Sequence, residues 1–596
     1  MGFINPAVPP DNVLQSRDKP ELERIKPIAQ DWAVNGFGSP SALYVLYLLK
    51  LAAFVFVGIL IIGRTEGLGG VSDVGDWWTE PIVFQKALCY MVLYEMFGFG
   101  SSTGPLGFRF IPPMGNVWYW ARPGTLRVPP WQAQNPLAGS PGNRRSIVDV
   151  ALYLGVLGLA AYLLFSNGTT DDATGILRLD TTILVILLVV WAALGVRDQV
   201  PFLCGRPEVY GLMLFVCLFD PANWIVGWQI AIVCIWLGAA ASKLTRHFGS
   251  VVAVMVANTP WQRSKTAKKM LWRNYPEDLR ASKVAEYSAH AGFAIEFFVP
   301  LVLLFSYGGT VGKIAVVVMV IFHIHITSTL PIAVPLEWNL FMIFGILFLF
   351  DHYGAVPLNT LESTPLLLVL LVVGVAIPIW GNMRPDQVSF LPAMRYYAGN
   401  WATTQWLFRK DTAAEDKLDS TLVKSSPLIV KQLETLYDPD AAELFLDKAR
   451  AFRSMHPHGR ALNGLLKHAA PGGDVDAYTV REGEFLSGVL VGWNFGDAHW
   501  HGHNTLAAVQ EQCRFAPGDV RVIELESQPI HKQFQRYRIY DAVDGLVEEG
   551  TVKVKDMIEH QPWLDLNYGF PIDVEFRAEE APSAGGAPRA PVAGVK

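Results

Sequence analysis

The sequence predicts a polytopic α-helical membrane bundle of nine or ten transmembrane helices, followed by a small soluble α+β domain with an antiparallel sheet. The 596 residues are 51% hydrophobic and 17% charged, with a mean hydropathy of +0.27, whereas soluble domains carry about 25% charged residues. The charges divide unevenly at Arg384. Residues 1–383 hold 49 of the 102 charged side chains, about 13% of positions, and residues 384–596 hold 53, about 25%. The chain is therefore neither wholly soluble nor wholly embedded.

The predicted spans are apolar runs close to the length of about 20 residues that crosses a bilayer as a helix. Five are continuous, at 42–63, 222–244, 291–308, 314–333 and 365–381. Four are shorter or interrupted, at 147–166, 181–196, 208–219 and 336–350. The run 82–99 carries Lys86 and Glu95 and is the weakest of the ten. We therefore expect a transmembrane domain over residues 42–383.

Basic residues in the short loops predict the orientation of such a protein. The segment 245–287 has eight basic residues, 101–146 has five arginines, and the N-terminal arm 1–41 has four basic residues. Ten spans place all three on one side. We expect a multi-pass protein of the plasma membrane, in contact with the lipid bilayer, with the N-terminal arm and the C-terminal domain in the cytoplasm. The net charge of −6 argues against a nucleic-acid partner.

The stretch 101–146 interrupts the transmembrane domain with an aromatic and proline-rich insert that does not fit a helix. Irregular backbone near a bilayer requires protein or a cavity to satisfy its polar groups. The aromatic side chains have two interpretations, an anchor at the membrane interface or the lining of a site: Phe108, Phe110, Trp118, Tyr119 and Trp120.

The C-terminal part, residues 384–577, shows helical periodicity and then strand periodicity. Between about 411 and 468 the pattern is helical, and a helix after Asp438-Pro439 places Leu444, Leu446 and Phe452 near one stripe. After residue 474 the period drops to two, which predicts strands at 520–525, 534–541 and 546–554. The tail 578–596 is rich in Ala, Pro and Gly and has the composition of a disordered segment.

Two charged residues in apolar helices are candidates for catalysis. Lys243 ends the run 222–244, where desolvation favours a neutral amine that can act as a base. The alternative is that its ammonium group reaches the aqueous interface. Glu296 lies in the run 291–308 and must be protonated or paired there, for catalysis or as a hydrogen bond between helices.

The sequence also contains two groups of histidines. His323 and His325 are separated by about 200° of rotation on a helix, so one is expected to face the bundle interior and the other to pack elsewhere. Farther along, His499, His501 and His503 alternate after Asp497, and on a strand they would share one face. That spacing suits a zinc or iron site, and a polar turn without metal is the competing interpretation.

Two short motifs carry a resemblance to a known family over about residues 220–350. The first runs from Trp236-Leu237-Gly238-Ala239 to Lys243-Leu244 and Phe248-Gly249. The second runs from Glu296 and Pro300-Leu301 to Phe322-His323 and Val334-Pro335. Together they resemble the vitamin K-dependent carboxylase-like transmembrane superfamily, the horizontally transferred transmembrane domain. The family pattern has Gly where this chain has Ala240 or Ala241, and Phe where it has Val334.

This resemblance implies that Lys243 is the base that activates a reduced quinone. The overall size and layout also resemble an uncharacterised bacterial family of large transmembrane proteins with a soluble C-terminal part, a likeness that implies no activity. Three hypotheses follow. The first is a membrane enzyme acting on a quinone or lipid-like substrate with Lys243, Glu296 and His323. The second is a transporter or scaffold for envelope lipids whose soluble domain recruits a protein partner. The third is a metal-dependent soluble domain with a large anchor.

Overall fold

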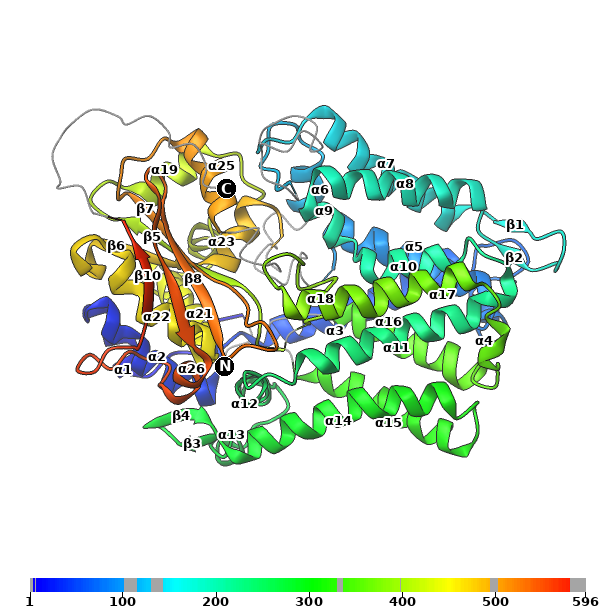
Figure 1. The fold of residues 1–596 in the computed structure, drawn as a ribbon, viewed down its shortest axis with the longest axis horizontal. Helices are drawn as coiled ribbons and strands as arrows, with labels where there is room; N and C mark the ends of the chain where they lie inside the picture. The colour runs from blue at the N-terminus through cyan, green and yellow to red at the C-terminus, as the bar shows by residue number, and fades with distance from the viewer. Residues whose placement is uncertain are drawn as a thin grey trace.

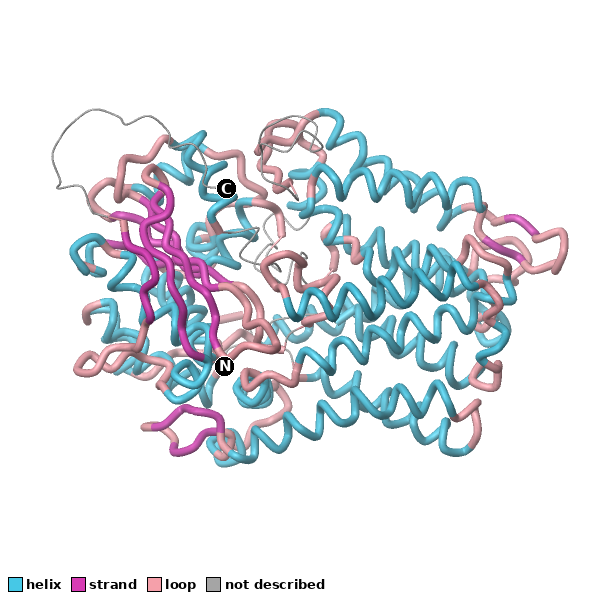
Figure 2. The backbone as a smooth tube through the Cα atoms, viewed as in Figure 1, coloured by secondary structure: helices cyan, strands magenta, loops and turns pink. Residues whose placement is uncertain are grey.

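The computed structural model describes residues 4–5, 7–100, 115–129, 143–329, 336–396, 398–493 and 502–578. Figure 1 shows two parts, a bundle of helices that run alongside one another and a sheet flanked by further helices. Figure 2 separates the same parts by secondary structure, with the long strands confined to the second. This arrangement is the predicted membrane bundle followed by a soluble α+β domain.

Each of the ten predicted spans contains a helix, and among the described residues six helices are long and apolar enough to cross a membrane. Those six are α3 (Ser41–Ile62), α7 (Ile147–Phe165), the helix Pro221–Ser242 that contains α11 (Trp224–Ser242), α14 (Lys283–Phe305), α15 (Thr310–Ser328), and the run Thr364–Met383 of α17 (Thr364–Leu371), η9 (Val372–Ala376) and α18 (Ile377–Met383). The other four are shorter: α5 (Pro81–Phe97), α8 (Thr181–Arg197), η5 (Pro207–Gly211) with α10 (Leu212–Val216), and α16 (Leu336–Ile346) with η7 (Leu347–His352).

Capping residues begin several of these helices where the apolar runs start. Ser146 and Asp149 form a reciprocal capping box at α7, and Ser282 accepts a hydrogen bond from Ala285 N–H at α14. Pro81 occupies the first turn of α5, where its missing N–H has no cost. Short connections join the helices at the end of the bundle far from the sheet, including the hairpin of β1 (Thr169–Thr170) and β2 (Leu177–Arg178).

The sheet of the second part is antiparallel and six-stranded, in the order β10-β9-β8-β7-β5-β6. Its strands are β5 (Thr403–Arg409), β6 (Tyr478–Glu482), β7 (Val520–Leu525), β8 (Phe534–Asp541), β9 (Gly545–Lys553) and β10 (Asp573–Arg577). The three strands predicted near 520–554 are confirmed as β7, β8 and β9. Strands β5, β6 and β10 were not predicted from the sequence, and the predicted tail lies outside the described residues beyond Ala578.

Helices cover both faces of this sheet. Leu407 packs in one buried cluster with Leu462 and Leu465 of α22 (Pro457–Ala469). Its neighbours Trp406 and Phe408 point to the opposite face, where the second cluster includes residues of α19 (Ala414–Thr421), α23 (Gly483–Leu490) and α25 (His503–Cys513). The remaining helices of this part are α20 (Ile429–Glu434), α21 (Pro439–Met455) and α26 (Val554–Glu559). The predicted helix after Asp438 is α21, with Asp438 as its N-cap.

The N-terminal helices α1 (Asp11–Leu14) and α2 (Glu21–Asn35) pack against the soluble part, and α2 also contacts α12 (Phe248–Asn258) and α13 (Lys265–Lys269) of the segment after Lys243. Helix α2 contacts α21, and three ion pairs join these segments. They are Arg17–Asp440 at 2.8 Å, Lys448–Asp31 at 3.3 Å, and Arg450–Glu21. The N-terminal arm and the C-terminal half therefore lie at the same end of the bundle, as an even number of crossings requires.

The described part of the aromatic insert contacts the soluble part. Helix α6 (Gly115–Trp120) presents Tyr119 and Trp120, both fully buried. The Tyr119 hydroxyl donates to Leu490 O, and Trp120 Nε1 donates to Val491 O at 2.9 Å. These two aromatics therefore join the two parts of the chain. Trp118 is exposed, and Phe108 and Phe110 lie outside the described residues.

Candidate functional site

Lys243 and Glu296 form an ion pair between two helices of the bundle. Lys243 is the C-cap residue of α11, and Glu296 lies in α14, which packs alongside it. The side chains are 10% and 7% exposed, and the Lys243 ammonium group also lies 5.3 Å from the Phe248 ring. Such pairing allows two charges to remain in an apolar helical bundle. The lysine therefore does not extend freely into water.

His323 uses both of its ring nitrogens in buried hydrogen bonds. Trp236 Nε1 donates to His323 Nε2 at 3.0 Å, and His323 Nδ1 lies 2.7 Å from Asn339 Oδ1. An indole N–H is only a donor, so Nε2 must be unprotonated and Nδ1 must donate to Asn339. The neutral imidazole thus links α15 to α11 and α16. His325 is exposed instead, in agreement with the expected rotation between the two histidines.

The structure brings Lys243 and Glu296 into contact, and places His323 of α15 against the same helix, α11, through Trp236. Trp236, the partner of His323, precedes Lys243 by two helical turns, about 10 Å along α11. Helices α11, α14 and α15 pack in sequence, so one row runs from the ion pair to the buried imidazole. This row joins Trp236 and Lys243 of the first motif that carried the family resemblance to Glu296 and His323 of the second. Val334 and Pro335 of the second motif lie outside the described residues.

The segment after Lys243 connects this pair to the soluble part. Four residues on, His247 is fully buried and its Nε2 lies 3.1 Å from Gln528 Oε1. Burial lowers the pKa of His247 to about 4, so the ring is neutral near pH 7. Gln528 is held in turn by two hydrogen bonds with Asn400. This link had no signal in the sequence, because a lone histidine after a membrane helix has many interpretations.

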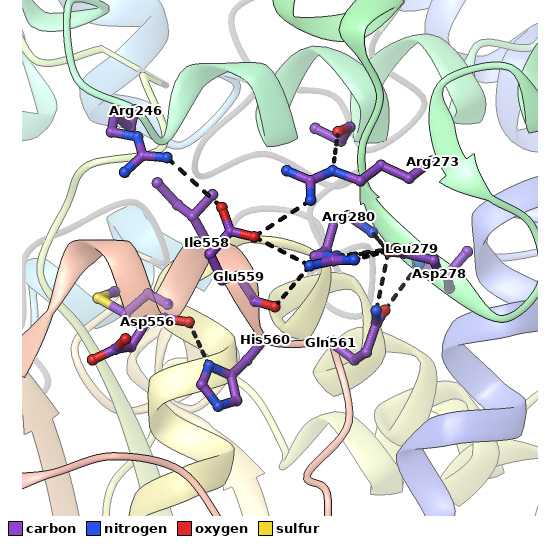
Figure 3. A network of polar contacts seen from close by, with 12 residues as sticks. Arg246, Arg273, Asp278, Leu279, Arg280, Asp556, Ile558, Glu559, His560 and Gln561 are labelled. Carbon is purple, nitrogen blue, oxygen red and sulfur yellow. Dashed lines mark hydrogen bonds and ion pairs between the residues drawn. The ribbon is translucent and has the colours of Figure 1, made fainter.

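An arginine cluster forms a second link between the two parts, around Glu559 at the end of α26. Figure 3 shows Arg246, Arg273 and Arg280 directed toward this carboxylate. The separations are 3.9, 3.4 and 3.1 Å, respectively. Arg280 also pairs with Asp278, at the hairpin of β3 (Trp272–Asn274) and β4 (Asp278–Ala281). The basic segment 245–287 therefore lies at the end of the bundle that carries the soluble part.

The predicted metal site is only partly within the described residues. Asp497, His499 and His501 lie outside them. His503 begins α25, and its Nδ1 lies 2.9 Å from Glu524 Oε2, while its ring stacks on Tyr540. Within the described part of the chain, no group of three or more His, Cys, Asp or Glu residues is placed to hold a metal ion.

A family model described as a transmembrane protein of unknown function, DUF3556, matches residues 1–575. The chain belongs to this family. The match covers the N-terminal helices, the bundle and the soluble part together, in keeping with the resemblance in overall layout. No curated protein and no solved structure matches the chain. None of these comparisons supports the vitamin K-dependent carboxylase-like superfamily specifically.

Proposed function

We propose that this transmembrane protein is an enzyme that acts on a lipid-like substrate, such as a quinone, at the Lys243–Glu296 pair. The observation that carries the proposal is the ion pair itself, formed between two bundle helices and almost closed to water. Charges in such a place are expensive and mark functional sites by default. The family resemblance of the surrounding motifs adds the quinone and the role of Lys243 as base.

The pair has suitable chemistry for moving a proton without changing its total charge. A proton that passes from the lysine ammonium to the glutamate carboxylate leaves a neutral amine beside a carboxylic acid. The two neutral groups avoid the desolvation cost of isolated charges. In this proposal the amine then accepts a proton from the substrate, and Glu296 holds the proton that the lysine released.

His323 has a positioning role in this proposal. Both ring nitrogens are engaged, so the imidazole does not exchange protons without losing a buried hydrogen bond. It fixes α15 and α16 relative to α11, the helix that carries Lys243. We also place the N-terminal arm and the soluble part in the cytoplasm, at the plasma membrane. The eight basic residues of 245–287 at that end support this orientation.

The test compares Lys243→Ala and Glu296→Gln with Lys313→Ala, which removes an exposed lysine near the start of α15. Each variant is expressed in a null strain, and the lipid and quinone extracts are compared by mass spectrometry. We expect both site variants to lose conversion at least 100-fold and the control to retain it. Full conversion by Lys243→Ala at wild-type protein levels rejects the proposal.

The competing function, a transporter or scaffold for envelope lipids, gives a different result in the same extracts. An enzyme changes the mass of its substrate, whereas a transporter changes only its location. An unchanged set of lipid masses together with an altered distribution between membranes or leaflets favours transport. In that case the Lys243–Glu296 pair is a structural link between helices.

A further inference from the structure

A second group of charged residues lies inside the bundle, away from the Lys243–Glu296 pair. It contains three carboxylates, Glu95 of α5, Glu208 of η5 and Glu337 of α16, and two cations, Lys50 of α3 and Arg206 before η5. Glu95, Arg206, Glu208 and Glu337 are each at most 6% exposed. Four separate segments of the bundle therefore contribute charge to one buried cluster, which we name the glutamate cluster.

Two of the three carboxylates have a cation of their own. Glu208 Oε1 lies 2.8 Å from Arg206 Nε, and Glu337 Oε1 lies 2.9 Å from Lys50 Nζ. Glu95 forms no ion pair within the described residues, although it interacts electrostatically with all four of these groups. Fully ionised, the cluster has a net charge of −1, and Glu95 carries the charge that no cation balances.

Several polar atoms of the cluster also have no hydrogen-bond partner among the described residues. They are Arg206 Nη2, Glu208 Oε2, Tyr210 Oη and Glu337 Oε2. Tyr210 is fully buried, and its hydroxyl interacts electrostatically with Glu95, Arg206, Glu208 and Glu337. Buried polar groups are nearly always hydrogen-bonded. Four unpartnered atoms in one place therefore point to a small polar or ionic ligand.

The backbone around Arg206 is of a kind that occurs at functional sites. Arg206 has φ 59° and ψ 58°, the left-handed conformation that non-glycine residues adopt only at a cost. The next five residues form a π-helical turn, Pro207–Gly211, which carries Glu208 and Tyr210 into the cluster. This geometry aims the guanidinium group at the aromatic faces of Trp338 and Tyr396, 4.2 and 5.1 Å away.

We propose that the glutamate cluster is a proton-binding site, in which Glu95 holds one exchangeable proton. The proton removes the charge that neither Lys50 nor Arg206 balances. The titratable and charged groups that face the site come from the elements packed around it. They are Tyr47 and Lys50 of α3, Tyr90 and Tyr94 of α5, Arg206, Glu208 and Tyr210 around η5, Glu337 of α16, and Tyr396. Cys204 of α9 (Gln199–Cys204) and Tyr153 of α7 instead donate to the backbone carbonyls of Glu95 and Met96.

The test uses dicyclohexylcarbodiimide, an apolar reagent that modifies protonated carboxyls in membranes. The acid O–H adds across one C=N bond, so that the proton goes to nitrogen and the carboxylate oxygen bonds to carbon. The adduct rearranges to a stable N-acylurea with no leaving group. We expect labelling of Glu95 in the full-length protein at pH 7, located by peptide mass spectrometry, and at least a tenfold loss of labelling at high pH.

Matched variants distinguish Glu95 from the other buried carboxylates. Glu95→Gln keeps the shape of the protonated side chain and should abolish the label, whereas Glu296→Gln should leave it unchanged. Infrared spectra provide a readout independent of reagent access, a protonated carboxyl band above 1,700 cm⁻¹ that Glu95→Gln removes. Absence of both the label and the band overturns the proposal. Protection of Glu95 by Na⁺ at constant pH overturns it too, because the ligand is then the metal cation.

Discussion

Two buried arginines, one in each part of the molecule, differ in how fully they are paired. In the soluble part, Arg453 bonds Glu482, Glu484 and His458 with its three nitrogens. In the bundle, Arg206 pairs with Glu208 alone, and its Nη2 has no hydrogen-bond partner among the described residues. The comparison indicates that the fully paired Arg453 stabilises the fold of the soluble part. Arg206 instead leaves a buried donor unpartnered within the glutamate cluster, where we propose that Glu95 binds a proton.

The largest loss of stability should come from replacing Arg453, the fully paired arginine. Arg453→Met leaves Glu482 and Glu484 buried without their cation, and we expect the free energy of unfolding of the soluble part to fall by about 3–5 kcal/mol. The measurement is urea denaturation of the full-length protein in detergent, followed by circular dichroism. Arg538→Met is the control, because its pair with Glu549 is one-third exposed and should contribute less than about 1 kcal/mol. Equal losses from the two variants contradict the prediction.

A smaller loss of stability should follow acidification, because two histidines are buried in their neutral form. Burial lowers the pKa of His247 to about 4, and burial together with Arg453 lowers that of His456 to about 3. As the pH falls below about 6.5, the unfolded chain binds protons that the folded chain does not. Each histidine therefore destabilises the fold by about 1.4 kcal/mol per pH unit, until the pH reaches its folded pKa.

Between pH 6.5 and 5.5 the two histidines together should lower the free energy of unfolding by about 2–3 kcal/mol. The same urea titration, repeated across this range, measures the slope. Replacing both residues with Gln should reduce the slope by that amount. His458, whose pKa burial also lowers, and Asp447 and Glu484, whose pKa values burial raises to about 6 and 7, still titrate in the double variant. An unchanged slope in the double variant shows that the two rings are not neutral in the fold.

The smallest loss of stability is expected at the arginine cluster between the two parts. Glu559→Gln removes one carboxylate from three partly exposed arginines, and we expect a loss below about 1 kcal/mol that 1 M salt largely removes. Thermal unfolding at low and high salt gives both values. A large loss that salt does not affect shows that these contacts are buried in the folded protein.

The strands of the soluble part were predictable where one face is buried and the other is open. Strand β8 alternates between more and less buried positions, and its sequence shows the period of two that identifies a strand. Strand β5 is buried along nearly its whole length, because helices cover both faces, and Thr403, Thr404 and Gln405 obscure its apolar character. Its position between β7 and the edge strand β6 arises from tertiary packing that local periodicity does not record.

The candidate site was predictable residue by residue, but its pairings were not. Lys243 and Glu296 are conspicuous in the sequence because a charge in an apolar helix is costly to bury. The structure places the two side chains in contact. The glutamate cluster gave a weaker signal. Glu95 only weakened one predicted span, and Glu208 and Glu337 are the first and second residues of short predicted spans, where a charge is ordinary. Their convergence depends on how four segments pack, which sequence spacing does not specify.

The contact between α2 and α21 can form only late in the synthesis of the chain. Glu21 and Arg450, which pair in the finished protein, are 429 residues apart. At about 5–20 residues per second, the apolar stripe of α2 waits roughly 20 to 90 s after its own synthesis before its partner leaves the ribosome. Helix α12 leaves the ribosome earlier and covers part of that stripe, but the face that packs on α21 stays open until α21 itself emerges. Synthesis of α21 rather than membrane insertion therefore ends the period in which this face of α2 is open to aggregation and proteolysis.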